Sequence, residues 1–260
     1  MMSSLLEIDG LTQRFGGLLA LDQVTLRVGR GETVGLIGPN GAGKTTLFNC
    51  ITGLLRPSAG AVRFGEPPAP LSELPAHAIV ARGIARTFQN IRLFGKMSVE
   101  DNVAVGAYCR TRAGVLASAL LTAEYRREEC LVRERSAALL RLVGLADRAR
   151  APAGSLPFGL QRRLEVARAL AAEPTLLLLD EPAAGLNPTE KQQLLELIAQ
   201  LKGRGLTLLI IEHDMRIVMP VSDRVAVLDY GELIAEGPPK AIQEDPRVIA
   251  AYLGDAGSGP

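Results

Sequence analysis

The stretch Gly38-Pro39-Asn40-Gly41-Ala42-Gly43-Lys44-Thr45 decides the fold of this chain of 260 residues. It follows an apolar run at 33–37 and leads into a helix-compatible segment that begins at Thr46. A G-x-x-x-x-G-K-T loop between a strand and a helix is the context in which this pattern binds phosphate. The glycines let successive N–H groups face an anion, and the helix start adds positive partial charge. We therefore predict that residues 38–46 bind a nucleoside triphosphate.

Two side chains of this loop carry its chemistry. Lys44 is predicted to bridge the β- and γ-phosphates, and the hydroxyl of Thr45 to ligate the magnesium ion that accompanies them. The alternative is a glycine-rich turn that happens to contain a lysine. The flanking strand and helix argue against that alternative.

A second apolar strand ends in two carboxylates. Leu176–Leu179 is followed directly by Asp180 and Glu181, and open α/β sheets bind ligands at the C-terminal ends of their strands. We predict that Asp180 holds magnesium through water and that Glu181 is the general base or orienting group for the attacking water. The alternative, a capping or turn carboxylate, is disfavoured after four leucines in a chain with a phosphate loop.

Two further polar side chains are expected near the γ-phosphate. His213 follows the apolar strand Leu206–Ile211, and adjacent parallel strands would bring it beside Glu181. A lone histidine is more often structural, so its assignment depends on the other motifs. Gln89 lies where the predicted core gives way to a helical region. Its amide can reach magnesium or the attacking water if that region rotates inward.

Composition and charge exclude several classes of protein. With 47% hydrophobic and 22% charged residues the chain is an ordinary globular protein. Lysine and arginine exceed aspartate and glutamate by 29 − 28 = 1, so no basic excess indicates a nucleic-acid partner. Three scattered cysteines fit reduced thiols in the cytosol. The apolar runs are too short to span a bilayer, and the N-terminus lacks a secretory leader pattern, so any membrane association is expected through a partner.

Apolar strands alternate with helical segments, which predicts an α/β fold with a mostly parallel sheet covered on both faces. Short strands at 5–8 and 24–28 are expected to flank a glycine turn near residues 15–17. From about residue 99 to 145 the pattern becomes helical, with Gly144 able to end the helix. The expected apolar face of that helix comprises Leu131, Leu139, Leu142 and Val143.

The ordered motifs resemble those of the ATP-binding subunit of an ABC transporter, over essentially the whole chain. The phosphate loop resembles Walker A, Gln89 the Q-loop, Asp180-Glu181 the end of Walker B, and His213 the switch histidine. The signature segment is matched by residues 155–170, and the D-loop by residues that include Gly185, Leu186 and Asn187. By resemblance, Phe15 is the aromatic that stacks on adenine; the alternative is that it packs within its own hairpin.

The signature motif departs from the family pattern Leu-Ser-Gly-Gly-Gln. This chain has, in order, Leu156, Pro157, Phe158, Gly159 and Leu160, followed by Gln161. The serine hydroxyl and the glutamine amide are thus absent. Gly159 and the N-terminus of the following helix can still meet a γ-phosphate bound to a second subunit. The departure puts the strength of nucleotide sandwiching in doubt, and not the fold.

The resemblance implies a P-loop NTPase (RecA-like) core with an N-terminal antiparallel β-subdomain and an inserted α-helical subdomain. It implies a domain over 1–254, with a core lobe of 1–88 and 165–235, a helical lobe of 89–164, a C-terminal element of 236–254 and a polar tail of 255–260. The implied ligands are ATP and Mg2+. The implied partners are a copy or paralogue of the chain, two transmembrane permease subunits and, indirectly, a substrate-binding protein, at the cytoplasmic face of a bacterial inner membrane.

Several segments look like the branched-chain amino acid branch of this family. They include Phe15-Gly-Gly-Leu-Leu-Ala20, Ile211-Glu-His-Asp-Met215 and the C-terminal run 245–254. Importers of urea and short amides carry closely similar subunits, so that substrate class stays open. A soluble ABC protein of DNA repair or translation would usually fuse two cassettes or insert a long coiled coil. A small-molecule kinase or nucleotide switch would lack the signature helix and His213.

Overall fold

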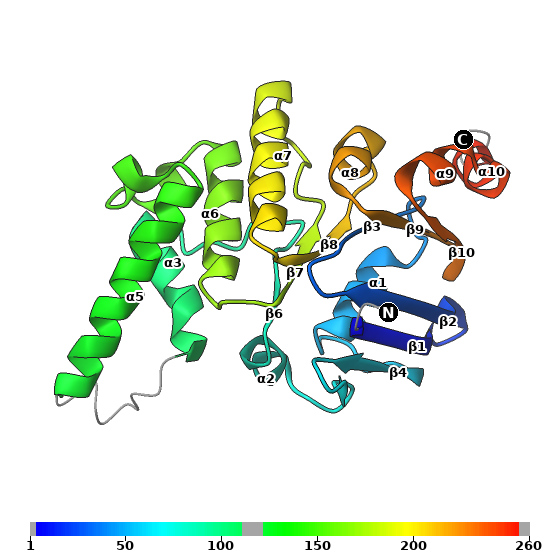
Figure 1. Cartoon of the computed structure of the whole chain (residues 1–260), viewed down its shortest axis with the longest axis horizontal. Coiled ribbons are helices and arrows are strands. Elements are labelled where there is room, and N and C mark those ends of the chain that lie inside the picture. The colour runs from blue at the N-terminus through cyan, green and yellow to red at the C-terminus, as the bar shows by residue number, and fades with distance from the viewer. Residues whose placement is uncertain (1–3, 111–121, 255–260) are drawn as a thin grey trace.

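A computed structural model describes residues 4–110 and 122–254 and contains two β-sheets with helices around them (Figure 1). The larger sheet has the strand order β10-β9-β3-β8-β7-β6, in which β10 is antiparallel to β9 and the other pairings are parallel. Its strands are β3 (Thr33–Ile37), β6 (Ile84–Arg86), β7 (Leu176–Asp180), β8 (Thr207–Ile211), β9 (Arg224–Asp229) and β10 (Glu232–Gly237). The predicted α/β fold with a mostly parallel sheet is confirmed.

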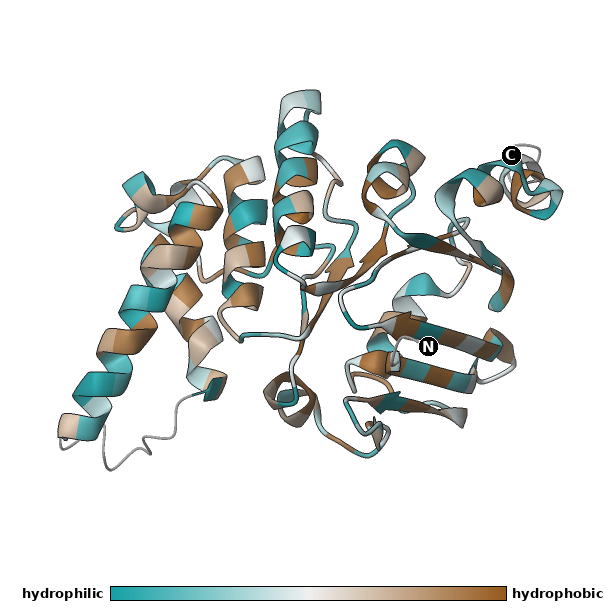
Figure 2. Ribbon diagram, viewed as in Figure 1, coloured by the Kyte–Doolittle hydropathy of each residue, from teal (hydrophilic) through white to brown (hydrophobic). Residues whose placement is uncertain are grey.

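The smaller sheet is antiparallel, with the order β2-β1-β4-β5. Its strands are β1 (Ser4–Phe15), β2 (Leu18–Gly29), β4 (Ala59–Phe64) and β5 (Ala69–Pro70). Phe15 pairs with Leu18 across the expected glycine turn, so both hairpin strands are longer than predicted. Residues along β1 alternate in hydropathy, whereas β7 and β8 are runs of leucine and isoleucine apart from Asp180 and Thr207, and every residue in them is buried (Figure 2). One face of the small sheet is therefore solvated, while the central strands are buried on both faces.

The helices form two groups. Three pack against one another at one end of the molecule: α3 (Val99–Ala107), α5 (Ala123–Leu142) and α6 (Phe158–Leu170). The others lie along the sheets: α1 (Lys44–Ile51), α2 (Ala76–Ala81), α7 (Pro188–Gly203), α8 (Met215–Val221), α9 (Pro239–Glu244) and α10 (Pro246–Gly254). Short 3-10 turns occur at Tyr108–Arg110, Ala146–Arg148 and Ala153–Ser155. The boundary predicted at 164/165 falls inside α6, and the division into lobes stays a prediction.

The central strands join two hydrophobic cores. Leu177 and Leu179 of β7 face the core shared with the helical group, whereas Leu176 and Leu178 face the core beneath the small sheet. This alternation follows from the two-residue period of a strand. A third core lies under α8, α9 and α10. Because β7 is anchored on both faces, the two carboxylates at its end are held at a fixed position.

The apolar face predicted for the long helix is partly wrong. Helix α5 buries Val132, Ser136 and Leu140, which recur every four residues, while Leu131 is 50% exposed. Among the other residues expected on that face, Val143 is buried in the core as predicted, whereas Leu139 and Leu142 pack only at its edge. The centre of the buried face is a small polar residue, Ser136. A prediction made from hydrophobic residues alone therefore placed the face about one residue away from its observed position.

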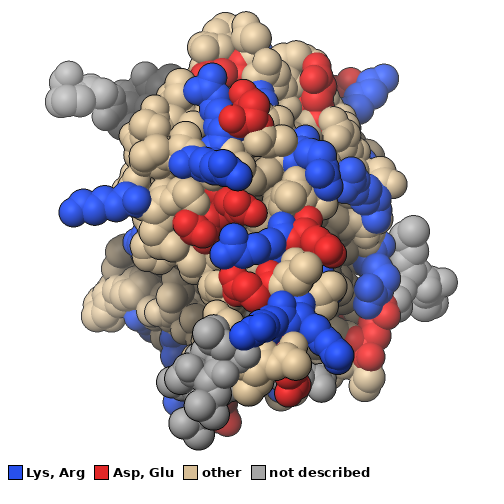
Figure 3. Space-filling view, turned by 90° about the vertical axis from the view of Figure 1, so that its left-hand side faces the viewer, with Lys and Arg blue, Asp and Glu red and all other residues tan. Residues whose placement is uncertain are grey.

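The outer end of the helical group carries charges of both signs (Figure 3). On α5, Arg133 lies 3.2 Å from Glu129, and Arg135 lies 2.6 Å from Glu173. Exposed pairs of this kind contribute at most about 1 kcal/mol each to stability. The mixture of signs is typical of a solvated face.

Candidate nucleotide site

The phosphate loop connects β3 to α1 with backbone angles that only glycine adopts without strain. Gly38 has φ 148° and a Cβ there would lie 2.0 Å from the carbonyl oxygen of Leu228; Gly43 has φ 99° and a Cβ there would lie 2.5 Å from the carbonyl oxygen of Ala20. Gly43 is also the N-cap of α1 and offers no capping side chain. The first N–H groups of α1 are therefore free to bind an anion at the loop.

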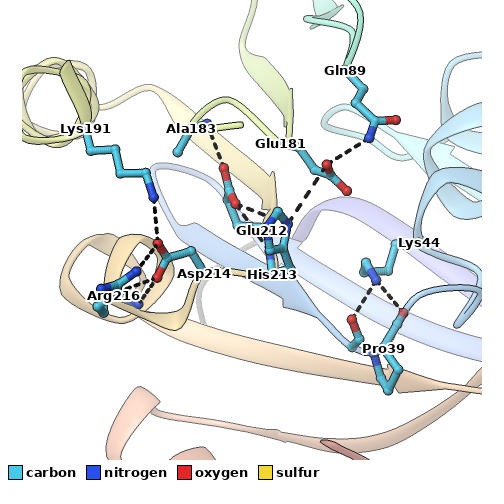
Figure 4. A network of polar contacts seen from close by, with 11 residues as sticks. Pro39, Lys44, Gln89, Glu181, Ala183, Lys191, Glu212, His213, Asp214 and Arg216 are labelled. Atoms are coloured by element: carbon cyan, nitrogen blue, oxygen red, sulfur yellow. Dashed lines mark hydrogen bonds and ion pairs between the residues drawn. The ribbon is translucent and has the colours of Figure 1, made fainter. Parts of the chain in front are cut away.

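Lys44 is held inside this loop. Its Nζ donates hydrogen bonds to the carbonyl oxygens of Gly38 at 2.6 Å and Pro39 at 2.7 Å (Figure 4). Burial lowers the pKa of Lys44, while the nearby charges of Glu181 and Asp180 raise it. The ammonium group thus has partners that a phosphate oxygen can replace, and two carboxylates favour its charged form.

Asp180 is buried at the end of β7 against an arginine. Arg86, at the end of β6, donates from Nη2 to Oδ2 of Asp180 at 2.6 Å, and both side chains are almost fully buried. The guanidinium of Arg86 lies 5.3 Å from the ring centre of Phe48 and 5.1 Å from that of Phe88. Such a pair fixes the carboxylate in one orientation while leaving its second oxygen for a cation.

Glu181 has a strained backbone and a defined partner. Its φ of 45° lies in the left-handed region, and its N–H donates to the carbonyl oxygen of Ile211 at 2.9 Å. The Nε2 of Gln89 donates to its Oε2 at 2.9 Å. A non-glycine residue with positive φ costs about 1 kcal/mol or more and is often found at functional sites. The strain here aims the carboxylate at Gln89 and the phosphate loop.

His213 lies beside Glu181, as the pairing of β7 with β8 predicts. Its Nδ1 is 4.0 Å from Oε2 of Glu181, and 59% of its side chain is exposed. The preceding residue, Glu212, is buried and accepts a hydrogen bond from the N–H of Ala183 at 2.7 Å (Figure 4). Burial raises the pKa of Glu212. Glu212 therefore connects the histidine segment to the chain that follows Glu181.

The start of α8 fixes the other side of His213. Asp214 is the N-cap of α8 and accepts from the N–H of Arg216. Hydrogen bonds from the Arg216 side chain hold the pKa of Asp214 below its usual value, and Lys191 of α7 adds a contact of 3.0 Å. The histidine thus sits between two anchored carboxylates.

A cavity of about 450 Å³ collects most of the predicted site. Its lining contains Phe15, Asn40, Gly41, Ala42, Gly43, Lys44, Thr45, Thr46, Gln89 and Glu181 from the predicted set, together with Leu18, Leu19, Ala20 and Tyr230. Phe15 is 48% exposed at this cavity, so its ring is available to a base; the packing alternative would require a buried ring. Its assignment to adenine stays a prediction.

The signature segment and the D-loop lie together, outside that cavity. Phe158 approaches Gly185, where an added Cβ would be 3.0 Å from its ring. Gly159 faces Glu190 at the start of α7, and a Cβ on Gly159 would lie 2.3 Å from Oε1. Asn187 of the predicted D-loop is the N-cap of α7 and accepts from the N–H of Glu190 at 2.9 Å. The sequence missed this structural role, although Asn-Pro-Thr-Glu is a capping-box pattern.

The remaining signature residues are oriented by the fold of α6. Leu156 is buried and Leu160 packs at the edge of the helical core, whereas Gln161 donates to the carbonyl oxygen of Leu156 at 2.8 Å. Pro157 is the N-cap of α6 and provides no side-chain acceptor. Leu186 of the D-loop is buried in the same core. The free N–H groups at the start of α6 are what this segment offers to an anion.

Restoring the family residues with Pro157→Ser and Leu160→Gln is expected to raise the ATPase activity of the isolated chain. A serine at this N-cap can bond an N–H of the first turn, which stabilises a helix start by about 1 kcal/mol. The measurement is steady-state phosphate release, with each single variant as control. No change, or a loss, would mean that the helix dipole already suffices or that a partner compensates.

The oxygen donors of the site fit a magnesium ion. Thr45 offers a hydroxyl, Gln89 an amide oxygen and Asp180 a carboxylate, and Mg2+ prefers such ligands and keeps several waters. Among the described residues there is no cluster of three or more histidine, cysteine, aspartate or glutamate side chains that could hold a metal on its own. This donor set therefore suits an ion that a triphosphate helps to bind.

Sequence reasoning missed three residues of the site. Arg86 directly precedes the Gln89 segment, Glu212 directly precedes His213, and Tyr230 occupies the turn between β9 and β10. A charged residue at the end of an apolar strand was the available signal for Arg86 and Glu212. Nothing in the local pattern places Tyr230 near the phosphate loop, because that contact depends on the order of strands in the sheet.

Comparisons with known proteins agree with this geometry. Residues 21–184 match a family described as ABC transporter, and residues 232–258 match one described as branched-chain amino acid ATP-binding cassette transporter. The chain is 46% identical over 257 residues to the high-affinity branched-chain amino acid transport ATP-binding protein LivG of Salmonella typhimurium, covering 98% of this chain and 100% of LivG. It is also 46% identical to BraF of Pseudomonas aeruginosa, with the same coverage.

A solved structure shares the fold over nearly the whole chain. It is the ADP conformation of MJ1267, an ATP-binding cassette of an ABC transporter. Its TM-score is 0.84 at 33% identity, covering 97% of this chain and 100% of MJ1267. Within the described residues, no helix combines the length and the hydropathy needed to cross a membrane.

Proposed function

Because the chain belongs to the ABC transporter family, whose ATPases couple ATP hydrolysis to transport, we propose that it energises a membrane importer of branched-chain or other hydrophobic amino acids. The observation that carries the proposal is the single cavity where Lys44, Gln89 and Glu181 meet, in a chain that matches LivG and BraF along almost its full length. The substrate class rests on those relatives, since the transported molecule does not touch this subunit.

The residues of the cavity have separate roles in this proposal. The N–H groups of the phosphate loop and Lys44 bind the β- and γ-phosphates, and Phe15 stacks on the adenine. Glu181 accepts a proton from the attacking water, while Gln89 and His213 orient that water and the γ-phosphate. Thr45, Gln89 and Asp180 hold Mg2+, which neutralises charge that develops on the phosphate oxygens.

The partners follow from the location of the signature segment. Residues 156–161 and the D-loop lie outside the cavity of their own chain, so in this proposal they complete the ATP site of a second copy or a paralogue. Two permease subunits hold the pair at the cytoplasmic face of the membrane, and a substrate-binding protein delivers the amino acid to them. No nucleic acid takes part.

The experiment combines biochemistry with uptake. The purified chain is assayed for Mg2+-dependent ATP hydrolysis, and a tagged copy is pulled from detergent-solubilised membranes of its own cell. We expect ATPase activity, co-purification of two membrane-spanning proteins, and loss of leucine uptake when the gene is deleted. Loss of urea uptake instead would assign the related urea branch, and co-purification with DNA-repair or ribosomal proteins alone would refute a transport role.

Phe94→Ala is expected to abolish co-purification of the permeases and transport while leaving the isolated chain almost as stable as before. Phe94 follows the Gln89 segment and is 50% exposed, whereas its neighbour Leu93 packs against the helical core. An exposed aromatic in the segment that follows Gln89, whose amide contacts Glu181, suits a groove for a permease helix.

The control for that variant is Leu131→Ala, because Leu131 is also 50% exposed but lies on α5. It should leave transport unchanged. Thermal unfolding decides the alternative, in which Phe94 caps the helical core: a buried Phe→Ala change costs about 3–5 kcal/mol and lowers the melting temperature by many degrees. Such a drop would refute the interface assignment.

A further inference from the structure

Two buried side chains of α6 form hydrogen bonds with the backbone at Phe88 and Gln89. The guanidinium of Arg162 donates from Nη1 to the carbonyl oxygen of Phe88 at 2.7 Å and from Nη2 to that of Gln89 at 2.8 Å. Glu165 accepts from the N–H of Phe88 at 3.2 Å and from Nη1 of Arg162 at 2.8 Å. Three backbone groups next to the Gln89 side chain are thus bound by one helix.

This pair is costly, so stability alone does not account for it. Arg162 and Glu165 are each 1% exposed. Burial raises the pKa of Glu165, and the charge of Arg162 and the N–H of Phe88 lower it again only in part. Within the described residues the Nε of Arg162 has no hydrogen-bond partner. A buried ion pair often stabilises no more than an apolar replacement, and its best-attested benefit is specific positioning.

The contacts form a continuous path from the signature segment to the reacting carboxylate. Helix α6 begins at Phe158, directly after Pro157, and Arg162 lies about one turn further on. Arg162 and Glu165 hold the backbone at Phe88 and Gln89, and the Gln89 side chain donates to Glu181 at 2.9 Å. The N-terminal part of α6 and the backbone at Gln89 are therefore held together by these hydrogen bonds.

We infer that Arg162 and Glu165 are positioning residues that make Gln89 follow α6. A displacement of α6, as when its N-terminus meets a partner's nucleotide, is thereby converted into a displacement of the Gln89 amide relative to Glu181. This inference rests on the proposed ATPase function and deepens it. Its alternative is that the pair only attaches α6 to the sheet.

A double-mutant cycle on the full-length chain separates the two. Arg162→Met and Gln89→Ala are each expected to lower kcat for ATP hydrolysis about tenfold, with little change in the dissociation constant for ATP. If Arg162 acts through Gln89, the double variant should be no slower than Gln89→Ala alone, because residues that act as a unit are non-additive. A purely structural role predicts that the two losses multiply.

Arg163→Met is the matched control on the same helix. Arg163 is the adjacent arginine and donates to Gln193 and to the carbonyl oxygen of Val143 instead. It should leave kcat within about twofold of wild type. An equal loss in Arg163→Met, or multiplied losses in the cycle, would overturn the inference. Absence of ATP turnover in the wild-type chain would instead refute the proposed function itself.

A second pair of variants covers the case in which Arg162→Met does not fold. Arg162→Lys keeps a charge beside Glu165 but lacks the planar fork that spans two carbonyl groups. Glu165→Gln keeps an acceptor for the N–H of Phe88 but removes the negative charge. Both should show the same non-additivity with Gln89→Ala, each variant being checked first by thermal unfolding. Multiplied losses for both would count against the inference.

Discussion

Lys44→Ala is expected to lower the rate of ATP hydrolysis by about a hundredfold or more and to weaken ATP binding. The ammonium group is the one cation that lines the described cavity, and a positioned charge inside a closed site is worth several kcal/mol to a transition state that carries extra negative charge. The measurements are steady-state phosphate release and a binding titration with ATP.

The fold of Lys44→Ala should be almost unchanged, because two effects oppose each other. The variant loses hydrogen bonds to Gly38 and Pro39, worth about 1–3 kcal/mol together, but it also removes a buried charge whose pKa is already lowered by desolvation. The control is Lys202→Ala, since Lys202 also donates to a backbone carbonyl and a carboxylate but is not part of the cavity lining. Wild-type turnover in Lys44→Ala would contradict the assignment of the loop.

The central strands and the phosphate loop were predictable because their local sequence patterns indicate their structure. The runs in β3, β7 and β8 are buried throughout, and short continuous apolar runs that alternate with helical segments are typical of a sheet that is covered on both faces. The loop of residues 38–45 was predictable from its G-x-x-x-x-G-K-T pattern between an apolar strand and a helix, and the positive φ angles found at Gly38 and Gly43 explain the glycines there. From the parallel pairing of β7 with β8 it also followed that His213 would lie beside Glu181.

Contacts that depend on long-range packing were not predictable. Arg86 reads as a surface residue in sequence, yet it is buried against two phenyl rings and bound to Asp180, because β6 pairs with β7 at the edge of the sheet. Arg162 likewise reads as a helix-surface charge. Each donates a hydrogen bond to a group more than seventy residues away in the sequence, and no local pattern contains that information. The misplaced apolar face of α5 has the same origin, since its buried Ser136 is defined by neighbouring helices.

Glu181→Gln is expected to lower hydrolysis by about a hundredfold to ten-thousandfold while leaving ATP binding intact. The amide keeps the shape of the side chain, and its oxygen can still accept from Nε2 of Gln89, which donates at 2.9 Å in the wild-type chain. It cannot accept the proton of the attacking water, and loss of a general base typically removes this much rate. With hydrolysis blocked and binding retained, an ATP-dependent dimer should accumulate on gel filtration.

The control for this variant exploits a second glutamate with the same unusual backbone. Glu173 has φ 49°, close to the 45° of Glu181, but it is paired with Arg135 on the helical group. Glu173→Gln therefore tests whether an amide side chain at a left-handed backbone position lowers activity by itself. We expect this variant to hydrolyse ATP at the wild-type rate and not to form a stable dimer. If Glu181→Gln released phosphate at that same rate, another group would have to accept the proton. Glu212 is buried and bound to Ala183, and the imidazole of His213, 4.0 Å from Glu181, would become the next candidate.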